Sequence, residues 1–155
     1  SKIKIFKKIF FKQREKLINN NISNWINLHT FYSEVIIFLK KLIQKNKLNI
    51  ITLKNYESVE ILCRSKQLYL NRKQVYDESI ISNKIEALNL YCELNHTKQE
   101  NIMIVDDNIF HLLDLQIKNY SIFLAAWFDI PKEYLSLAKS YNIPIIYDIK
   151  EFFDV

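Results

Sequence analysis

Two groups of polar residues in this sequence are suited by type and spacing to bind a phosphate. Thr52 ends the apolar run LNIIT and is followed closely by Lys54 and Asn55. A hydroxyl group there, with backbone N–H groups at the start of a following helix, can hold a phosphoryl oxygen; a threonine can also simply cap that helix. Lys84 stands in the run SNKIEAL. A lysine in the first turn of a helix opposes the helix dipole, which indicates a carboxylate or phosphate to neutralise; the alternative is a solvated lysine.

An acidic pair, Asp106 and Asp107, follows the apolar run NIMIV. Two adjacent carboxylates repel each other, and a hard cation with oxygen ligands, above all Mg²⁺, removes that cost. The sequence therefore predicts a magnesium site at the pair. The alternative is that one aspartate caps the next helix while the other faces water. His111 follows the pair by one helical turn, but like His29 and His96 it has no metal-ligand spacing and is interpreted as structural.

Apolar runs that alternate with helical periodicity must position these residues. We predict a short strand or an extended arm at 3–11, and strands at 48–52, within 75–82, and at 101–105, 121–127 and 144–147. Helices are predicted at 12–27, 31–46, 56–66, 83–94, 108–117, 131–141 and 149–153. Such alternation is typical of an α/β protein, a Rossmann-like three-layer sandwich with a mainly parallel sheet. We expect a single domain over residues 1–155. Ligands bind beyond the carboxyl ends of parallel strands, so the polar groups are predicted to meet there.

The order of these motifs resembles that of the haloacid dehalogenase (HAD) superfamily, whose motifs are a strand-ending Thr or Ser, a helix-borne Lys and a strand-ending acidic pair. Thr52, Lys84 and the pair at 106–107 lie 32 and 22 residues apart. The resemblance covers roughly residues 30–153 and is most specific over KIEALNLYCELNHTKQENIMIVDDN.

The resemblance implies a Mg²⁺-dependent phosphatase that acts on a small phosphorylated molecule. Thr52 would hydrogen-bond the phosphoryl group, with Lys54 and Asn55 beside it. Lys84 would hold the nucleophilic carboxylate, and the acidic pair would hold Mg²⁺. These groups would stabilise the charge on the phosphoryl oxygens. Residues 10–29 would be a small cap or flap.

One HAD motif is missing. The family's nucleophile and acid–base residues form the pattern DxDx[TV], but no Asp-x-Asp occurs here and no Asp precedes Asp77. Either a strand upstream supplies the nucleophile, or residues 3–9 are that strand, with Lys7 and Lys8 near the acidic positions. In the second case the chain is a pseudoenzyme that acts as a binding or interaction module. A receiver-like regulatory domain is a third interpretation, but its acidic pair would follow the first strand.

Composition restricts the remaining function classes. The chain contains no glycine, so a P-loop or a GxGxxG dinucleotide site is not expected, and asparagine is expected in left-handed turns and helix ends.

The charges are unevenly distributed along the chain. Residues 1–54 carry 12 Lys/Arg and 2 Asp/Glu, whereas residues 55–155 carry 10 Lys/Arg and 15 Asp/Glu. Without a nucleic-acid-binding motif, this basic end is interpreted as a solvated surface rather than a nucleic-acid site. No apolar run suggests a membrane partner. Two distant cysteines fit a reducing cytoplasm, and the oligomeric state is open.

Overall fold

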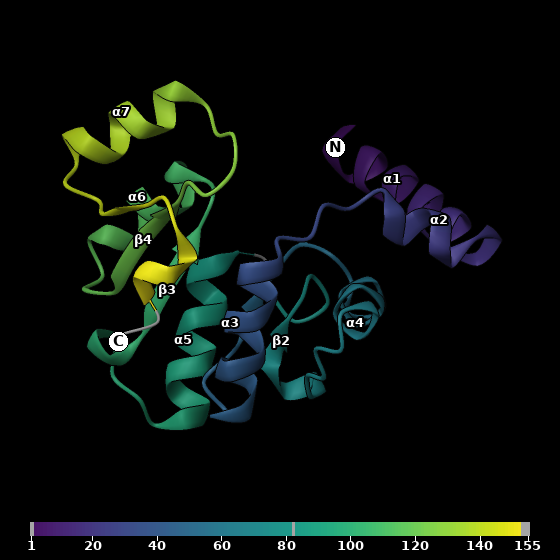
Figure 1. The fold of residues 1–155 in the computed structure, drawn as a ribbon, viewed down its shortest axis with the longest axis horizontal. Helices are drawn as coiled ribbons and strands as arrows, with labels where there is room; N and C mark the ends of the chain where they lie inside the picture. The colour runs from purple at the N-terminus through teal and green to yellow at the C-terminus, as the bar shows by residue number, and fades with distance from the viewer. Residues whose placement is uncertain (1, 82, 153–155) are drawn as a thin grey trace.

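The structure is a computed structural model that describes residues 2–81 and 83–152. Helices and short strands alternate along most of the chain (Figure 1). The α-helices are α1 (Lys2–Asn20), α2 (Ile22–Asn27), α3 (Ser33–Gln44), α4 (Tyr56–Ser65), α5 (Lys84–Asn95), α6 (Ile109–Gln116) and α7 (Lys132–Ser140). The strands are β1 (Ile50–Ile51), β2 (Val75–Tyr76), β3 (Met103–Asp106), β4 (Ser121–Ala125) and β5 (Ile145–Ile146). Short 3₁₀ helices are η1 (Arg72–Gln74), η2 (Gln99–Asn101) and η3 (Ile149–Phe152).

The strands form two separate parallel sheets. One contains β1 and β2, and the other has the order β3-β4-β5. The sequence analysis expected the strands that end at Thr52 and near Asp106 to lie in one sheet, so the structure differs on this point. Within the described ranges, no strand pairs with the outer edge of β3. The protein is thus an α/β protein with parallel pairing, but its strands are short and its sheet is divided.

The three-stranded sheet has helices against both of its faces. Successive side chains of β4 point to opposite faces, as strand geometry requires. Ile122 and Leu124 pack with α5, α6 and α7, whereas Phe123 packs with α3 and η3. The first face contains most of the core: Leu88, Ile109, Leu112, Leu115, Tyr120, Ile122, Leu124, Ala138 and Ile143.

The strand predicted at residues 3–11 is wrong, because these residues belong to α1. Ile5 and Ile9 lie one helical turn apart, and the run KQREKL that follows is rich in helix-forming residues, so the helix extends through the segment. This correction also removes the hypothesis that Lys7 and Lys8 replace the acidic residues of a first strand. The predicted helix 12–27 is divided at Asn21, whose side chain accepts a hydrogen bond from the N–H of Asn24 and begins α2.

The remaining predicted elements occur near their expected positions, although the strands are shorter. The expected strands at 48–52 and 144–147 reduce to two residues each, and the terminal helix is the 3₁₀ helix η3. Pro131 is the N-cap of α7 rather than its first residue. Two positions of the predicted elements, 82 and 153, lie outside the described residues. None of the described helices has the length and apolarity needed to cross a membrane.

Residues other than glycine end the helices in the left-handed conformation. Asn46, Asn119 and Asn142 have φ of 54°, 59° and 54°, as the absence of glycine predicted. Gln67 and His96 adopt it as well, with φ of 59° and 48°. These residues lie just beyond α3, α6, α7, α4 and α5, where a left-handed residue lets the chain satisfy the last carbonyl groups.

Candidate functional site

The carboxylate of Asp106 is the centre of a buried polar group at the end of β3. The ammonium group of Lys84 contacts its Oδ2 atom directly, across 22 residues of sequence. The backbone N–H of Asn108 donates to Oδ1 at 3.0 Å. The Asp106 side chain is 4% exposed and that of Lys84 is 26% exposed, so solvent screens this ion pair little. The fold thus brings together two of the residues selected from the sequence.

Helix starts hold both partners in place. Asn83 is the N-cap of α5 and accepts the N–H of Glu86 at 2.9 Å, which fixes Lys84 as the first residue of that helix. Asn108 is the N-cap of α6 and accepts the N–H of Phe110 at 3.0 Å. Lys84 and the acidic pair therefore project from the starts of two helices and the end of a parallel strand.

His111 joins this group, although the sequence analysis interpreted it as structural. Its Nδ1 lies 3.2 Å from Oδ2 of Asp106, and its side chain is 41% exposed. The position of His111, five residues after Asp106 on the first turn of α6, is a signal that the sequence does contain. A histidine at this place can orient the Asp106 carboxylate through this contact.

The two carboxylates of the pair are electrostatically unequal. Burial alone would raise the pKa of Asp106, but hydrogen bonds from Lys84 and from the Asn108 N–H, with the charges of Lys84 and His111, lower that pKa below its ordinary value. Burial and the adjacent Asp106 carboxylate raise the pKa of Asp107. The surroundings of Asp106 therefore favour its charged form, whereas those of Asp107 disfavour its charge, which a bound cation would stabilise.

Thr52, Lys54 and Asn55 lie at the carboxyl end of the other sheet. The N–H of Thr52 donates to the carbonyl of Tyr76 on β2, and its hydroxyl oxygen accepts the N–H of Lys54 at 3.1 Å. Asn55, not Thr52, is the N-cap of α4. Within the part of the chain that the structure describes, no hydrogen bond or ion pair joins Thr52 to Lys84 or Asp106. A single site that includes all three remains a prediction.

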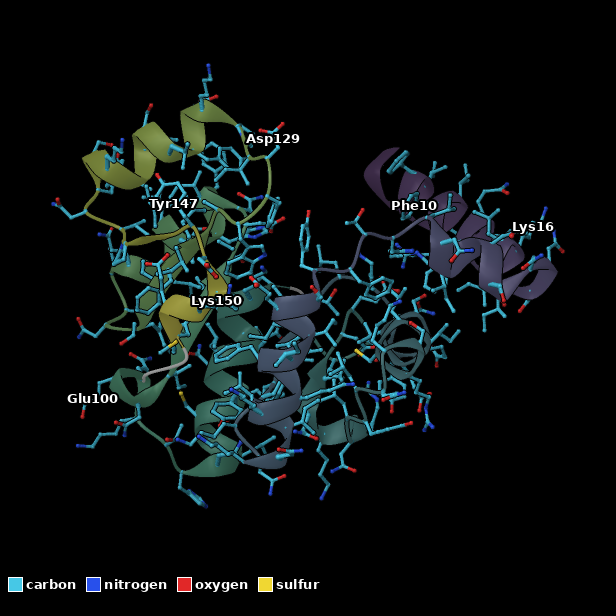
Figure 2. The ribbon with its side chains drawn as sticks, viewed as in Figure 1. Phe10, Lys16, Glu100, Asp129, Tyr147 and Lys150 are labelled. Atoms are coloured by element: carbon cyan, nitrogen blue, oxygen red, sulfur yellow. The ribbon has the colours of Figure 1, made fainter. Side chains whose placement is uncertain are left out.

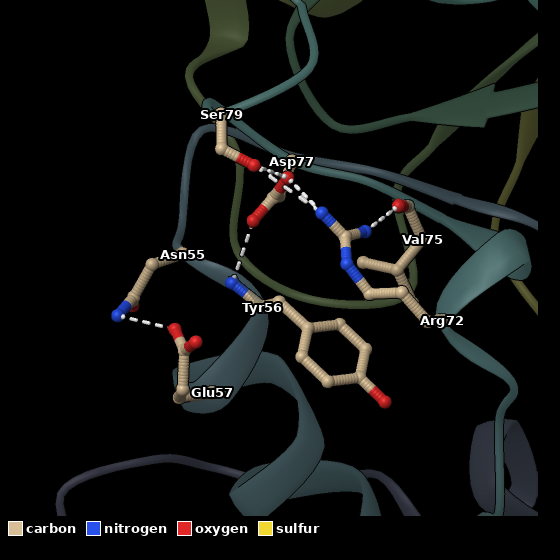
Figure 3. A network of polar contacts seen from close by, with 7 residues as sticks. All are labelled: Asn55, Tyr56, Glu57, Arg72, Val75, Asp77 and Ser79. Carbon is tan, nitrogen blue, oxygen red and sulfur yellow. Dashed lines mark hydrogen bonds and ion pairs between the residues drawn. The ribbon is translucent and has the colours of Figure 1, made fainter.

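A second buried carboxylate, Asp77, was missed by the sequence analysis. It directly follows β2 and is 2% exposed. Figure 3 shows its three donors: the Tyr56 N–H at 2.8 Å, the Arg72 guanidinium at 2.8 Å and the Ser79 hydroxyl at 2.7 Å. Burial alone would raise the pKa of Asp77, but these hydrogen bonds and the charge of Arg72 lower it. The first N–H of α4, expected as a phosphate donor, is therefore already bonded to Asp77.

An open pocket lies beyond the carboxyl ends of β4 and β5. Its volume is about 390 Å³, and Tyr32, Trp127 and Tyr147 are among the residues that line it. Trp127 lines the pocket, whereas Phe128 stacks on Tyr32 at a centroid distance of 5.9 Å. The pocket is at the same edge of the three-stranded sheet as Asp106.

The donor set at the acidic pair matches Mg²⁺ in kind. Carboxylate oxygens are the ligands that Mg²⁺ prefers, and one or two of them suffice when water or phosphate oxygens complete the octahedron. Among the described residues, no group of three or more His, Cys, Asp or Glu side chains is placed to hold a metal. The acidic pair therefore fits a site that phosphate and water complete, and does not fit an all-protein cage.

The class defined by these observations is an α/β protein with parallel strands and a lysine–carboxylate group at a strand end. Comparison with protein-family models, with curated proteins and with solved structures gave no match.

Proposed function

We propose that this chain is a phosphate- and Mg²⁺-binding domain of HAD type, which hydrolyses a phosphomonoester when a nucleophilic aspartate outside these 155 residues is supplied. The observation that supports the proposal most is the Lys84–Asp106 contact at the carboxyl end of β3. This contact joins two motifs in the arrangement that the family resemblance implies, with a parallel strand, a helix-borne lysine and an acidic pair in the expected order.

The proposed roles follow from the charges. Lys84, held by Asp106, offers its remaining ammonium hydrogens to an anionic ligand. Asp107 would hold Mg²⁺ directly and Asp106 through its less occupied oxygen or a water. When bound, the metal would supply charge stabilisation for a phosphate. Thr52, Lys54 and Asn55 would contact the same phosphate only if the two sheets approach each other in the complete site.

Neither of the two buried carboxylates, Asp77 and Asp106, is placed to replace the nucleophile. Asp106 is held by Lys84, and Asp77 has its oxygens occupied by three donors. An attacking carboxylate needs a free oxygen aimed at phosphorus. We therefore assign binding and charge stabilisation to this chain and leave the attack to a separate aspartate.

The experiment that tests the proposal is a titration with MgCl₂, with and without inorganic phosphate, followed by the melting temperature. A ligand that binds the folded state raises that temperature by mass action. We expect a concentration-dependent rise that is larger with phosphate present. Asp107→Asn should reduce it and the double variant Asp106→Asn/Asp107→Asn should abolish it, each measured against the variant's own metal-free baseline.

Asp114→Asn is the matched control, because Asp114 is an exposed aspartate on the same helix as His111. It should keep the full Mg²⁺ effect. An equal rise in the wild-type protein and in the double variant would show that the metal binds elsewhere and would contradict the proposal.

A further inference from the structure

Helix α1 has an exposed apolar stripe along one side. Ile5, Phe6, Ile9, Phe10 and Leu17 are 63%, 67%, 56%, 50% and 51% exposed. Ile9 and Phe10 follow Ile5 and Phe6 by four residues, and Leu17 follows Phe10 by seven, so these residues lie on one face of an α-helix. Phe6 and Phe10 stack at a centroid distance of 6.1 Å. Five large apolar side chains at half exposure or more on one helix face are typical of an interaction site.

The stripe does not serve to pack α1 on the rest of the chain. α1 contacts α2, and the half-buried side of α1 carries Phe11, Arg14 and Ile18 instead. The guanidinium of Arg14 lies over the rings of Phe10 and Phe11, at 4.8 and 5.1 Å. α1 and α2 form an arm that stands away from the sheets (Figure 1), and Phe10 and Lys16 lie on that arm (Figure 2).

Lysines border the stripe. Exposed Lys8 and Lys12 follow Ile5 and Ile9 by three residues, which makes them neighbours on the helix surface. Exposed Lys16 lies one turn further along, on the same side of the helix as the stripe. α1 contains six lysines and one arginine against one glutamate, a net charge of +6. From the sequence, this basic end was interpreted as a solvated surface, because no nucleic-acid-binding motif accompanies it. As a helix, the same residues divide into an apolar face and a basic border.

We propose that α1 binds the surface of an anionic lipid bilayer and lies in the plane of the interface. An apolar helix face inserts to the boundary between head groups and acyl chains, and the bordering lysines reach back to anionic lipid head groups. The thirteen residues from Ile5 to Leu17 extend over twelve steps of the helix, about 18 Å at 1.5 Å per step. Most of the exposed side chains on this face are apolar, which favours a lipid surface. A nucleic-acid site would instead present basic groups to the phosphates.

The test measures partitioning of the 155-residue chain onto vesicles by co-sedimentation. Vesicles of phosphatidylcholine mixed with phosphatidylserine are compared with vesicles of phosphatidylcholine alone. We expect binding to the mixed vesicles that weakens as salt is added. Phe6→Ser/Phe10→Ser should lower the partition coefficient more than about tenfold, since two aromatic side chains lose their burial. Lys8→Gln/Lys12→Gln/Lys16→Gln should lower it by about fivefold per lysine on the mixed vesicles.

Ile117→Ser is the control for the apolar changes, because Ile117 is 81% exposed and lies at the end of α6. It should bind vesicles like the wild-type chain, and circular dichroism should show the same helix content in all variants. Equal binding by the wild-type chain and the phenylalanine variant would overturn the proposal. A second contrary outcome would be a wild-type chain that does not bind vesicles and sediments as a dimer, while the phenylalanine variant sediments as a monomer. The stripe would then be an interface between copies. Binding to an RNA homopolymer in place of vesicles would overturn it as well.

Discussion

The position of Lys84 has a physical explanation in the structure. A lysine at a helix start faces the positive end of the helix dipole, and such a placement needs an anion. The anion is the Asp106 carboxylate, which lies at the end of a strand distant in sequence. Asp106 in turn is too buried to carry its charge without a cation. Each charge therefore stabilises the other, and a ligand would meet the two side chains as an ion pair.

Lys84→Met should destabilise the protein. Methionine keeps most of the aliphatic stem but removes the ammonium group, so the buried Asp106 carboxylate loses its main partner. We expect a loss of about 2 kcal/mol in the free energy of unfolding at neutral pH, measured by urea titration. Lys98→Met is the control, because Lys98 pairs with Glu100 at 3.7 Å on a surface where both side chains are 79% and 67% exposed. Such a surface pair contributes at most about 1 kcal/mol. Equal losses in both variants would contradict the central place of Lys84.

Asp77 gives the fold an acid-dependent contribution to stability. Its folded-state pKa lies below the ordinary value of 3.8. A lowered folded pKa stabilises the protein above the unfolded-state pKa, and this stabilisation is lost as the pH falls through the folded-state pKa. Asp77→Asn removes that charge. We expect the variant to be less stable than the wild-type chain near neutral pH by about 1–2 kcal/mol, and the difference to shrink below about pH 4.

The measurement for Asp77 is the free energy of unfolding by urea at several pH values between about 3 and 6. Asp114→Asn, a change at an exposed aspartate, controls for the general effect of one lost negative charge. A constant difference between wild-type and Asp77→Asn over the whole range would show that the network in Figure 3 stabilises the fold through packing and not through the charge of Asp77.

At the scale of elements, helix ends carry unusual strain because the chain has no glycine. His96 closes α5 at φ 48°, and the N–H groups of His96 and Thr97 donate back to the carbonyl groups of Glu93 and Cys92. A left-handed residue with a side chain costs about 1–2 kcal/mol relative to a right-handed one. Asparagine reduces this cost through its short polar side chain, whereas histidine does so less well.

His96→Gly should therefore stabilise the protein. The gain from relieved strain exceeds the extra chain entropy of glycine, and we expect a net increase of about 0.5–1 kcal/mol in the free energy of unfolding. His96→Ala is the matched control, since alanine removes the imidazole but keeps the Cβ atom, and it should not stabilise. The melting temperatures of the wild-type chain and the two variants test this prediction. An equal rise in melting temperature with alanine and with glycine would show that loss of the imidazole, and not relief of backbone strain, stabilises the protein.

At the scale of the whole molecule, the division into two sheets separates the groups that the sequence places in one site. Lys84 follows the carboxyl end of β2 by eight residues and yet contacts the end of β3, so the connection after β2 passes from one sheet to the other. Thr52 stays with β1 and Asp77 stays with β2. The phosphate site of the proposed function is therefore only partly assembled by these contacts.

The 155-residue chain should not hydrolyse phosphomonoesters at an enzymatic rate. In the proposed function Lys84 and the acidic pair bind and polarise a phosphate without attacking it, and the buried carboxylates Asp77 and Asp106 are held by other donors. Electrostatic stabilisation without the nucleophile leaves a small residual rate, far below the turnover of roughly 1–1,000 per second that is usual for enzymes. A steady-state assay with an aryl phosphate and Mg²⁺ measures this. Robust turnover that Lys84→Ala abolishes would show that the chain contains its own nucleophile.

The sequence predicted the helices and strands from α3 to η3 well, because their periodicity, caps and turn residues are local signals. It failed at residues 3–11, where β-branched and aromatic side chains suggested a strand although their spacing fits a helix. No local pattern in the sequence indicates that Asp77 is buried. An aspartate after a short strand can face water or accept three hydrogen bonds, and only the position of Arg72 and of the start of α4 decides between them.

The sequence by itself determined the order and type of most elements, the asparagines in left-handed positions at helix ends, and the contrast between a basic N-terminal segment and an acidic remainder. The sequence also led us to expect Lys84 and Asp106 in one site, but only the tertiary structure showed their direct contact, the addition of His111 and the division of the strands into two sheets. The physical reason is distance along the chain. Helix periodicity and capping act over a few residues, whereas an ion pair across 22 residues and the pairing of strands depend on how the elements pack.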